Sequence, residues 1–429
     1  MKKAHIISIG NELLIGDTVN TNAAWIGNFL TDLGFDVEQV TTIPDDYTLI
    51  YNGIKKSFKH ADFTVVTGGL GPTHDDITKK VVNDLFESTL VENSEVFAHI
   101  KKIFEQRDFE FSPSNAAQAM VPDKCTVLYN KQGTAPGMWF GENERYLAVL
   151  PGVPFEMKFL MREEVQPKID KLFAGHDVWM TEYFRTAGVP ESTLSDLIGD
   201  LDEFTDNGIG IAYLPNTGGV TIRLSTSAPD KEKAQKKLYR ISELVNQKAS
   251  DYIFGKGKDL ELAKVVGDLL NKKNMNIGVS ESCTGGLLSN SISDIPGCSE
   301  YFIGSVVAYS NDLKIKMLNV DPSTIEIHGA VSKEIALEMA EGVAKQTGSD
   351  VGVSTTGIAG PGGGTKEKPV GTVWMGFWIN GNHFALKTVF TNDRLINKQR
   401  TVMVVLETLR RQLLGIESLP YQLKPHRIQ

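Results

Sequence analysis

Short apolar runs alternate along the chain with segments that have one apolar and one polar helical face. Apolar runs of this length predict buried strands, and a repeat of about 3.6 residues predicts amphipathic helices. Strands separated by helices predict parallel βαβ units, in which ligands bind beyond the carboxyl ends of the strands. In the first part of the chain we expect a helix in 20–33 and strands in 4–10, 36–43, 61–73 and 145–157.

The regular alternation of predicted strands and helices stops near residue 175 and resumes near residue 262. Between these points the order strand, helix, strand, strand, helix predicts a small α+β module of roughly 75 residues. Residues 253–262 contain two glycines and two lysines, which indicates a linker. The last part again alternates strands and helices and predicts a second α/β domain. We therefore expect an α/β protein with domains at 1–172, 173–254 and 255–420.

The overall charge and the cysteine content limit the classes of ligand and the cellular compartment that we expect for this protein. The 429 residues carry a net charge of −9, so a broad nucleic-acid surface is not expected. Three cysteines fit neither a disulfide framework nor a zinc site, which favours a reducing cytoplasm. Gly10 ends the first apolar run too early for a signal peptide, and no stretch approaches the roughly 20 apolar residues that span a membrane. We expect a cytoplasmic protein whose ligands are small molecules.

A strand-to-helix turn in the last domain carries a candidate nucleophile. Strand NIGVSES ends at Ser282, and CTGG opens a helix. Such a turn exposes a side chain and directs helix N–H groups at an anion. A serine needs a base; no histidine of this domain lies in a loop motif, but Lys314 lies about one turn into the helix after strand FIGSVVAYS. Because parallel strands end at one sheet edge, we expect Ser282 and Lys314 to meet there, with Lys314 kept neutral by burial.

Two other interpretations compete with this pair. Serine, threonine and glycine at such a junction are often a plain helix cap, and a lysine one turn into a helix usually faces solvent. Cys283 offers a thiol instead, with Glu281 and Lys314 as partners, because a cysteine at a helix start can have a lowered pKa. The spacing leaves these alternatives open.

A second glycine loop of the last domain follows the strand that begins at residue 350. Its glycines, in TTGIAGPGGG at 355–364, permit close backbone approach to a phosphate or ribose. Basic residues near this loop, among them Arg394 and Arg400, offer charge to a phosphate.

The first domain has a glycine loop of its own at 67–76. The loop places Asp75 and Asp76 after a glycine turn, a pattern that suits a pyrophosphate held with Mg²⁺. The same two acids also suit a plain helix start, where they favour the helix dipole. Polar residues at 10–22 and Glu156 follow other strands, so three loops are expected to converge on one sheet edge.

These motifs resemble those of the CinA family. IGNELLIGDTVNTN, TGGLGPTHDD and LPGVPFEM are similar to the molybdopterin-binding-like (MoaB/MogA-type) domain, which implies a three-layer α/β fold. VSESCTGG, VAYSNDLK, STTGIAGPGGGTKEKPVGTVW and NDRLINKQR resemble the PncC, or nicotinamide-nucleotide amidase, domain. The middle module resembles a KH fold, but its PNTGGV turn carries no lysine or arginine, so RNA binding is not expected.

The resemblance implies that the last domain converts nicotinamide mononucleotide (NMN) to nicotinic acid mononucleotide and ammonia without a cofactor. Ser282 would attack the carboxamide, Lys314 would serve as base, and Tyr309 would orient the pair. N–H groups around Thr284 to Gly286 would hold the oxyanion or phosphate. The residues expected at this substrate are Cys283, Thr284, Gly285, Gly286, Thr356, Gly357, Gly360, Arg394 and Arg400.

For the first domain the resemblance implies cleavage of ADP-ribose to AMP and ribose 5-phosphate with a divalent metal, expected to be Mg²⁺. Its expected metal ligands are Asp75, Asp76 and Asp17. Its expected substrate contacts are Thr67, Gly68, Gly69, Gly71, Thr73, Asn20, Asn22 and Glu156. The family also implies a homodimer. The alternatives are a pterin-cofactor binding protein, or a competence or DNA-damage accessory protein without catalysis.

Overall fold

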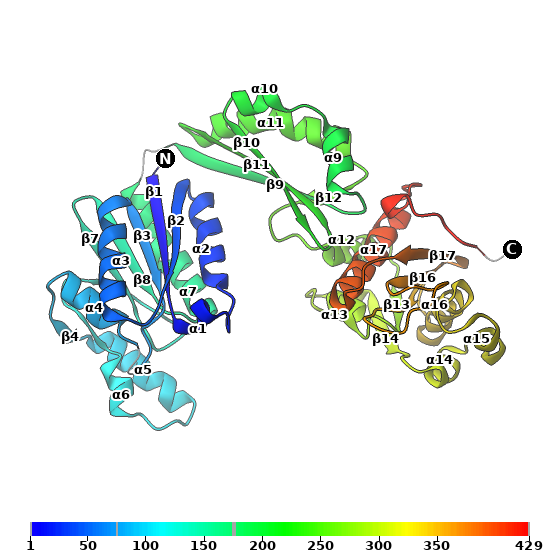
Figure 1. Cartoon of the computed structure of the whole chain (residues 1–429), viewed down its shortest axis with the longest axis horizontal. Helices are drawn as coiled ribbons and strands as arrows, with labels where there is room; N and C mark the ends of the chain where they lie inside the picture. Colours follow the sequence, from blue (N-terminus) through cyan, green and yellow to red (C-terminus); the bar gives the residue numbers. More distant parts are fainter. Residues whose placement is uncertain (1, 74–75, 174–176, 428–429) are drawn as a thin grey trace. The chain divides into compact units, whose positions relative to one another are not determined.

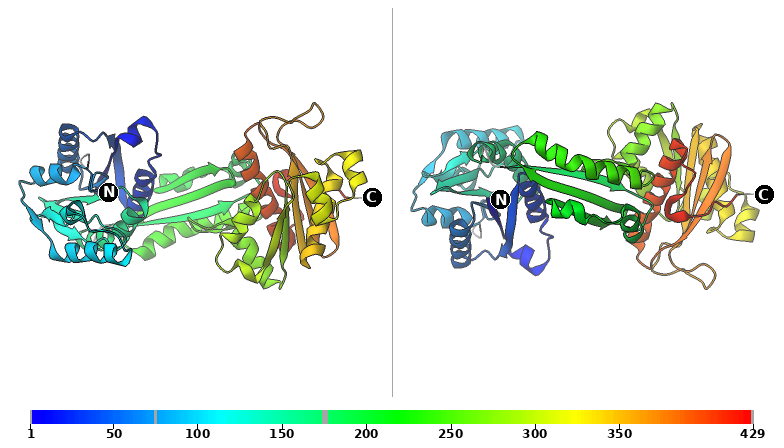
Figure 2. Two further views of the ribbon diagram at one scale, coloured as in Figure 1. Left: turned by 90° about the horizontal axis from the view of Figure 1, so that it is seen from below. Right: turned by 90° about the horizontal axis from the view of Figure 1, so that it is seen from above.

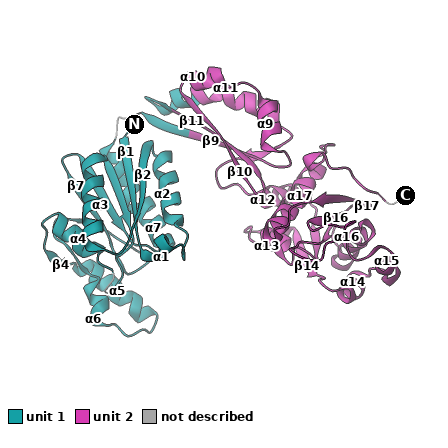
Figure 3. Ribbon diagram, viewed as in Figure 1, with its two compact units in different colours: residues 1–180, 227–235 teal, residues 181–226, 236–429 magenta. Residues whose placement is uncertain are grey.

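A computed structural model describes residues 2–73, 76–173 and 177–427. The chain forms two compact units, residues 1–180 with 227–235 and residues 181–226 with 236–429 (Figure 3). Both are built from β-sheets covered by helices, as the alternating pattern predicts.

A six-stranded sheet lies at the centre of the first unit, in the order β2-β1-β3-β8-β7-β6. Its parallel strands are β1 (Lys2–Ile9), β2 (Phe35–Ile43), β3 (Phe63–Thr67) and β8 (Arg145–Leu150). Strands β7 (Gly137–Glu142) and β6 (Thr126–Leu128) extend it antiparallel. The strand predicted at 145–157 ends at Leu150, because a Pro-Gly turn and helix α7 follow it.

Helices cover both faces of this sheet, which makes the domain three-layered (Figure 1). Strand β1 shows the cause: Ala4 and Ile6 point into one core, Ile7 and Ile9 into the other, with the period of two of a strand buried on both faces. The first core contains residues of α2 (Thr21–Asp32), α7 (Pro154–Leu160) and α8 (Gln166–Leu172); the second contains residues of α3 (Tyr47–His60) and α4 (Thr78–Leu85). The other elements are α1 (Asn11–Ile15), β4 (Leu90–Glu92), α5 (Ser94–Gln106), α6 (Pro113–Ala117), β5 (Met120–Pro122) and the π-helical η1 (Met161–Val165).

The middle module is a four-stranded sheet in the order β10-β11-β9-β12, along which helix α11 lies (Figure 2). Its elements are β9 (Val178–Thr186), α9 (Glu191–Ile198), α10 (Asp202–Asp206), β10 (Ile209–Asn216), β11 (Gly219–Ala228), α11 (Lys231–Ala249) and β12 (Ile253–Lys256). The prediction of a linker at 253–262 is wrong for its first four residues. Residues Ile253–Lys256 instead form an edge strand antiparallel to β9, because their main chain finds hydrogen-bond partners there.

The last domain has a five-stranded sheet in the order β14-β13-β15-β16-β17. Strand β13 (Ile277–Glu281) pairs in parallel with β14 (Phe302–Val307) and β15 (Val351–Gly357). Strands β16 (Thr372–Ile379) and β17 (Asn382–Val389) complete the sheet antiparallel. The helical elements are α12 (Leu262–Lys272), α13 (Leu287–Ser293), η2 (Cys298–Glu300), α14 (Asn311–Leu318), α15 (Pro322–His328), α16 (Lys333–Thr347), α17 (Arg394–Leu414) and η3 (Pro420–Gln422).

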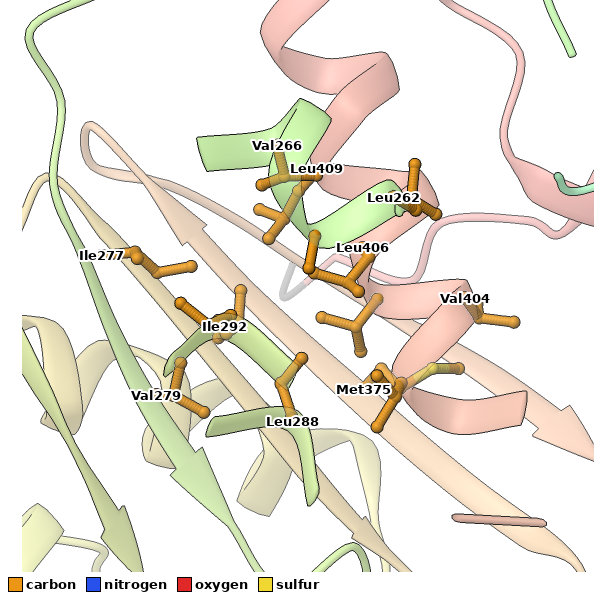
Figure 4. Close-up of a cluster of buried hydrophobic side chains, with 14 of the residues drawn as sticks. Leu262, Val266, Ile277, Val279, Leu288, Ile292, Met375, Val404, Leu406 and Leu409 are labelled. Carbon is orange, nitrogen blue, oxygen red and sulfur yellow. The ribbon is translucent and has the colours of Figure 1, made fainter. Parts of the chain in front are cut away.

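The main core of this domain lies between the sheet and three helices, α12, α13 and α17 (Figure 4). Ile277 and Val279 of β13 meet Leu288 of α13 and Leu406 of α17 there. Helix α16 packs over β13, β15 and β16, and other buried residues of this helix form a separate cluster with α14 and the segment that follows β14. The sheet is therefore held between helices, and the loop that follows β13 starts from a rigid, fully buried strand.

Candidate functional site

The candidate nucleophile and base come from two neighbouring parallel strands. Ser282 directly follows β13, and Lys314 lies in the first turns of α14, which follows β14. Because both strands end at the same edge, the two side chains meet: the Lys314 Nζ lies 3.2 Å from the Ser282 Oγ. The structure thus brings together the two residues that the sequence predicted at this edge.

Lys314 is buried inside the protein, with an exposed fraction of 1%. Its Nζ also lies 2.9 Å from the carbonyl oxygen of Ala308 and 3.3 Å from that of Tyr309. Burial lowers the pKa of the Lys314 amine below the usual range of a lysine. In the described ranges no carboxylate forms an ion pair with it. The surroundings therefore favour an uncharged amine.

The three oxygen contacts of Lys314 Nζ can also be made by a neutral amine. Such an amine has two N–H donors and one lone pair. When it donates to the carbonyl oxygens of Ala308 and Tyr309, the lone pair is left to accept the hydroxyl hydrogen of Ser282. This is the arrangement that a general base needs for removing a proton from a nucleophile.

Tyr309 holds this pair through its main chain. Its carbonyl oxygen contacts Lys314, whereas its side chain is 59% exposed. The Tyr309 hydroxyl accepts a hydrogen bond of 2.8 Å from Arg394 Nη2, and Arg394 Nη1 donates to Gly360 O at 3.0 Å. The Tyr309 side chain, predicted to orient the pair, thus contacts Arg394, and Arg394 links α17 to the glycine loop at Gly360.

Two threonines expected at the substrate form bonds within the protein instead. Thr284 and Thr356 are fully buried. The Thr284 hydroxyl lies 2.6 Å from that of Thr355, and the Thr356 hydroxyl donates to Ala330 O at 2.7 Å. The main-chain N–H of Ser282 donates to Thr355 O at 2.8 Å. The bonds of Ser282 and Thr284 to Thr355 attach the nucleophile loop to the end of β15 and fix the position of the serine.

Glu281, the last residue of β13, organises the turn that follows. Its buried carboxylate accepts hydrogen bonds from the N–H groups of Gly286, Leu288 and Ser289 and from the Ser289 hydroxyl. The Gly286 N–H, which we expected at the oxyanion, is therefore engaged by Glu281. Gly285 and Gly286 have φ angles of +61° and +96°, which glycine adopts without strain. Glu281 is thus a loop-positioning residue, and it is not free to serve a thiol as partner.

Replacing Glu281 by glutamine is expected to lower the free energy of unfolding by about 2–3 kcal/mol. The amide nitrogen of glutamine would face N–H donors that now share a carboxylate. Urea unfolding followed by circular dichroism measures the change. Glu300→Gln is the matched control, because the exposed Glu300 carboxylate has, among the described residues, only the side-chain amide of Asn271 as partner; this substitution should change stability by less than about 0.5 kcal/mol. Equal effects of both substitutions would contradict the role of Glu281.

Cys283 points into the main core of the domain and not into the site. Its exposed fraction is 6%, and it belongs to the buried cluster under α12, α13 and α17. Burial raises the pKa of the Cys283 thiol to about 12. A thiol that stays protonated is a poor nucleophile, so the geometry favours Ser282 over Cys283.

Helix α17 places two cations near the serine loop. Arg394 contacts Tyr309 and Gly360, as described above. Lys398 lies one turn further, and a Cβ added at Gly285 would lie 3.6 Å from its Nζ. The sequence analysis missed Lys398, although its spacing of four residues from Arg394 places both on one helical face.

The remaining two residues expected at this substrate have other surroundings. Gly357 has no room for a side chain, since a Cβ there would lie 2.7 Å from Thr372 O. Arg400 lines a different cavity of the same unit, which is described below.

In the first domain, two glycines allow loops to approach each other closely. Gly68 has a φ of +108°, and a Cβ there would lie 2.2 Å from Ile9 O. Gly69 has a φ of +67°, and a Cβ there would lie 2.1 Å from the Thr78 hydroxyl. Any larger residue would separate these loops. The two glycines are therefore needed for close packing at the sheet edge, whether or not a ligand binds there.

A cavity of about 400 Å³ lies at this edge. Of the predicted residues it brings together Gly68, Gly69, Gly71, Asp76 and Glu156. Its other polar lining residues are Glu12, Asp45, Gln118 and Thr134. Burial raises the pKa of the Glu156 carboxyl, which accepts a hydrogen bond of 2.6 Å from Asn130 Nδ2. The cavity is thus rich in carboxyl groups, and no basic side chain is found among its described lining residues.

Metal binding at this cavity depends on few residues. Asp76 accepts hydrogen bonds from the N–H and hydroxyl of Thr73. Asp17 is exposed and is not among the lining residues, and Asp75 lies outside the described residues. Within the described part of the chain, no three His, Cys, Asp or Glu side chains are grouped so as to hold a metal ion. The described carboxylates therefore do not form a complete metal site by themselves.

Three polar residues predicted at this ligand hold the loops in place. The Asn20 side chain caps α2 by accepting from the Ala23 N–H at 3.0 Å. Asn22 Nδ2 donates to Gly152 O at 2.7 Å, and the Thr67 hydroxyl donates to Pro151 O at 2.9 Å. These bonds join the three loops that the sequence predicted at one edge.

The fold and these sites define a class: an α/β protein of three modules, with a carboxyl-rich cavity in the first and a buried serine–lysine pair in the last. Family models match each module. They are described as "Probable molybdopterin binding domain" at residues 5–171, "Damage-inducible protein CinA KH domain" at 181–255 and "CinA C-terminal domain" at 259–413. Among the described helices, none is long and apolar enough to cross a membrane.

Relatives match over nearly the whole chain. A "CinA-like protein" of Chloroherpeton thalassium is 41% identical over 421 residues, which cover 96% of this chain and 99% of that protein. A "Putative competence-damage inducible protein" of Clostridium botulinum is 39% identical, with coverage of 96% and 100%. The chain belongs to the CinA family. A CinA crystal structure from Thermoplasma acidophilum is 37% identical and covers 39% of this chain and 97% of its own, with a TM-score of 0.37.

Proposed function

We propose that the last domain is an amidohydrolase that converts NMN to nicotinic acid mononucleotide and ammonia. The observation that carries this proposal is a buried lysine, with a lowered pKa, whose Nζ lies 3.2 Å from the hydroxyl of a serine at a strand-to-helix turn. A serine and a neutral lysine are sufficient for acyl transfer from an amide without a metal or cofactor.

Each step moves one proton through Lys314. Lys314 takes the Ser282 hydroxyl proton as Oγ attacks the carboxamide carbon, and a tetrahedral intermediate forms. The resulting ammonium returns the proton to the amide nitrogen, which leaves as ammonia, and the nicotinoyl group remains on Ser282 as an ester. Lys314 then deprotonates water, which attacks the ester, and the proton returns to Ser282.

The cations on α17 suit the phosphate of this substrate. Arg394 and Lys398 lie on one face of the helix beside the serine loop. A guanidinium and an ammonium are effective partners of a phosphate monoester. We assign them to binding, with no part in the chemical steps.

The test is product analysis with the purified full-length protein. NMN should yield ammonia and nicotinic acid mononucleotide in equal amounts, measured by a coupled ammonia assay and by chromatography. Removing divalent metals with a chelator should leave this reaction unchanged. Conversion to nicotinamide and ribose 5-phosphate instead would point to cleavage of the glycosidic bond and would contradict the proposal.

For the first domain we propose metal-dependent cleavage of ADP-ribose to AMP and ribose 5-phosphate. The cavity of about 400 Å³ between glycine loops supports it. A pyrophosphate in a carboxyl-rich cavity needs a cation to offset repulsion, so a divalent metal would bind with the substrate. Asp76 would be its ligand from the described residues, and we derive no step through it.

Asp76→Ala is expected to lower ADP-ribose cleavage by at least roughly 10-fold. The loss follows because Asp76 lines the cavity and carries charge that a metal would need. AMP formation, measured by chromatography at saturating Mg²⁺, reports the effect. Ammonia release from NMN by the same preparation is the internal control and should stay unchanged. Cleavage of ADP-ribose at the wild-type rate by the variant would show that Asp76 does not belong to the site.

Two alternative functions are considered: pterin binding by the first domain, and a competence or DNA-damage role of the whole chain. The match to a molybdopterin-binding model favours a pterin ligand, and a fold shared by several ligands does not decide the substrate. Calorimetric titration with a pterin and with ADP-ribose separates them. The names of the relatives point to competence or DNA damage, but the net charge of −9 opposes direct DNA contact. A salt-dependent DNA shift at physiological ionic strength would support that function.

A further inference from the structure

A cavity of the last unit lies where the middle module meets the last domain. Its volume is about 490 Å³, within the range of small-molecule sites. Three stretches form it: the start of α9, the β10–β11 turn, and the end of β17 with α17 and the segment after it. None of its lining residues belongs to the serine site.

The walls of this cavity are mainly apolar, and three charged residues also line it. Val220, Val389, Phe390 and Val404 contribute to the apolar wall. Two cations, Arg400 and Lys387, and one carboxylate, Glu191, also line it. An apolar cavity with a cationic excess suits a ligand that is apolar in its body and negative at one end.

The two cations are not neutralised by carboxylates. In the described structure neither Arg400 nor Lys387 forms an ion pair. The Lys387 Nζ lies 5.7 Å from the centre of the Trp374 ring, a contact that leaves its charge uncompensated. Burial raises the pKa of the Tyr421 hydroxyl, and the charge of nearby Arg400 acts in the opposite direction. Arg400 and Tyr421 both line the cavity.

Two further features set this cavity apart from an ordinary surface hollow. The Thr388 hydroxyl is shielded from solvent and has no hydrogen-bond partner in the described residues, although the residue lines the cavity. Tyr421 and Gln422 both have a positive φ, 52° and 56°, a conformation that residues other than glycine rarely adopt. The N–H of Tyr421 donates to Gly188 O at 2.7 Å, which holds this turn at the cavity. Strained backbone and an unpaired polar group are typical of ligand sites.

We propose that this cavity binds a small organic anion with an apolar body. Arg400 meets the anionic group, the Thr388 hydroxyl donates to it, and Phe390 and the valines contact the body. This site is separate from both proposed activities.

The experiment is calorimetric titration of the full-length protein with 2-naphthoate, 2-naphthyl phosphate and uncharged 2-naphthamide. The proposal expects millimolar or tighter binding of at least one anion and at least 10-fold weaker binding of the amide. The carboxylate and the phosphate show which anionic group the site prefers.

Two variants assign the binding to this cavity. Arg400→Gln removes charge, and Val389→Trp fills the cavity from a position that is 53% exposed and therefore tolerates a larger side chain. Both should weaken anion binding at least 10-fold, whereas Arg107→Gln, an exposed arginine of the other unit, should not. Circular dichroism melts confirm that the variants are folded. Absence of anion binding, or binding unaffected by both cavity variants, would overturn the proposal.

Discussion

Replacing Ser282 by alanine is expected to lower kcat/KM for ammonia release from NMN by at least roughly 10³-fold. The substitution removes the oxygen that forms the ester. The main-chain bond from the residue 282 N–H to Thr355 O does not need the side chain, so the loop should stay in place. A coupled ammonia assay measures the rate, and chromatography confirms the loss of nicotinic acid mononucleotide. ADP-ribose cleavage should be unchanged in the same preparation.

The matched control for this prediction is Cys283→Ala. The thiol is buried in the core with a pKa raised to about 12, so its loss should cost less than roughly 10-fold in rate. The reverse pattern, with ammonia release retained in Ser282→Ala and abolished in Cys283→Ala, would establish a thiol mechanism and contradict the serine–lysine proposal.

Replacing Lys314 by methionine is expected to lower the deamidation rate by about 10²–10⁴-fold, the usual contribution of a general base. Methionine has similar length and is compatible with burial, but it has no lone pair able to take the Ser282 proton. Lys316→Met on the same helix is the control, because Lys316 is exposed and should leave the rate unchanged. A Lys314→Met protein that is folded and fully active would exclude the lysine as the base.

The pH dependence of the wild type provides a second measurement of the same role. Only the uncharged amine can take a proton, and burial lowers the pKa of Lys314. The rate should therefore rise with pH and level off at an apparent pKa below the usual value of about 10.4 for lysine. Initial rates of ammonia release between about pH 6 and about pH 10 test this. A rate that falls with rising pH over that range would contradict the assignment.

The sequence by itself determined the fold class and the neighbourhood of the serine and the lysine. Apolar runs alternating with amphipathic helices led to the parallel strands β13, β14 and β15. Parallel strands end at a common edge, so residues that follow two adjacent strands must come close. The sequence thus led us to expect Ser282 and Lys314 near each other, and the pairing of β13 with β14 in the structure places them in contact.

Only the tertiary structure decided what each group at that edge does. The carbonyls of Ala308 and Tyr309 orient the lysine, Glu281 accepts from the N–H expected at the oxyanion, and burial raises the pKa of the Cys283 thiol. These outcomes depend on which side of a loop faces the core and which donors find partners. A linear pattern does not contain that information, because burial and hydrogen bonding depend on segments that are far apart in the chain. Helix α17 is an example, since it places Arg394 beside Tyr309 near the serine and Arg400 in a cavity elsewhere in the unit.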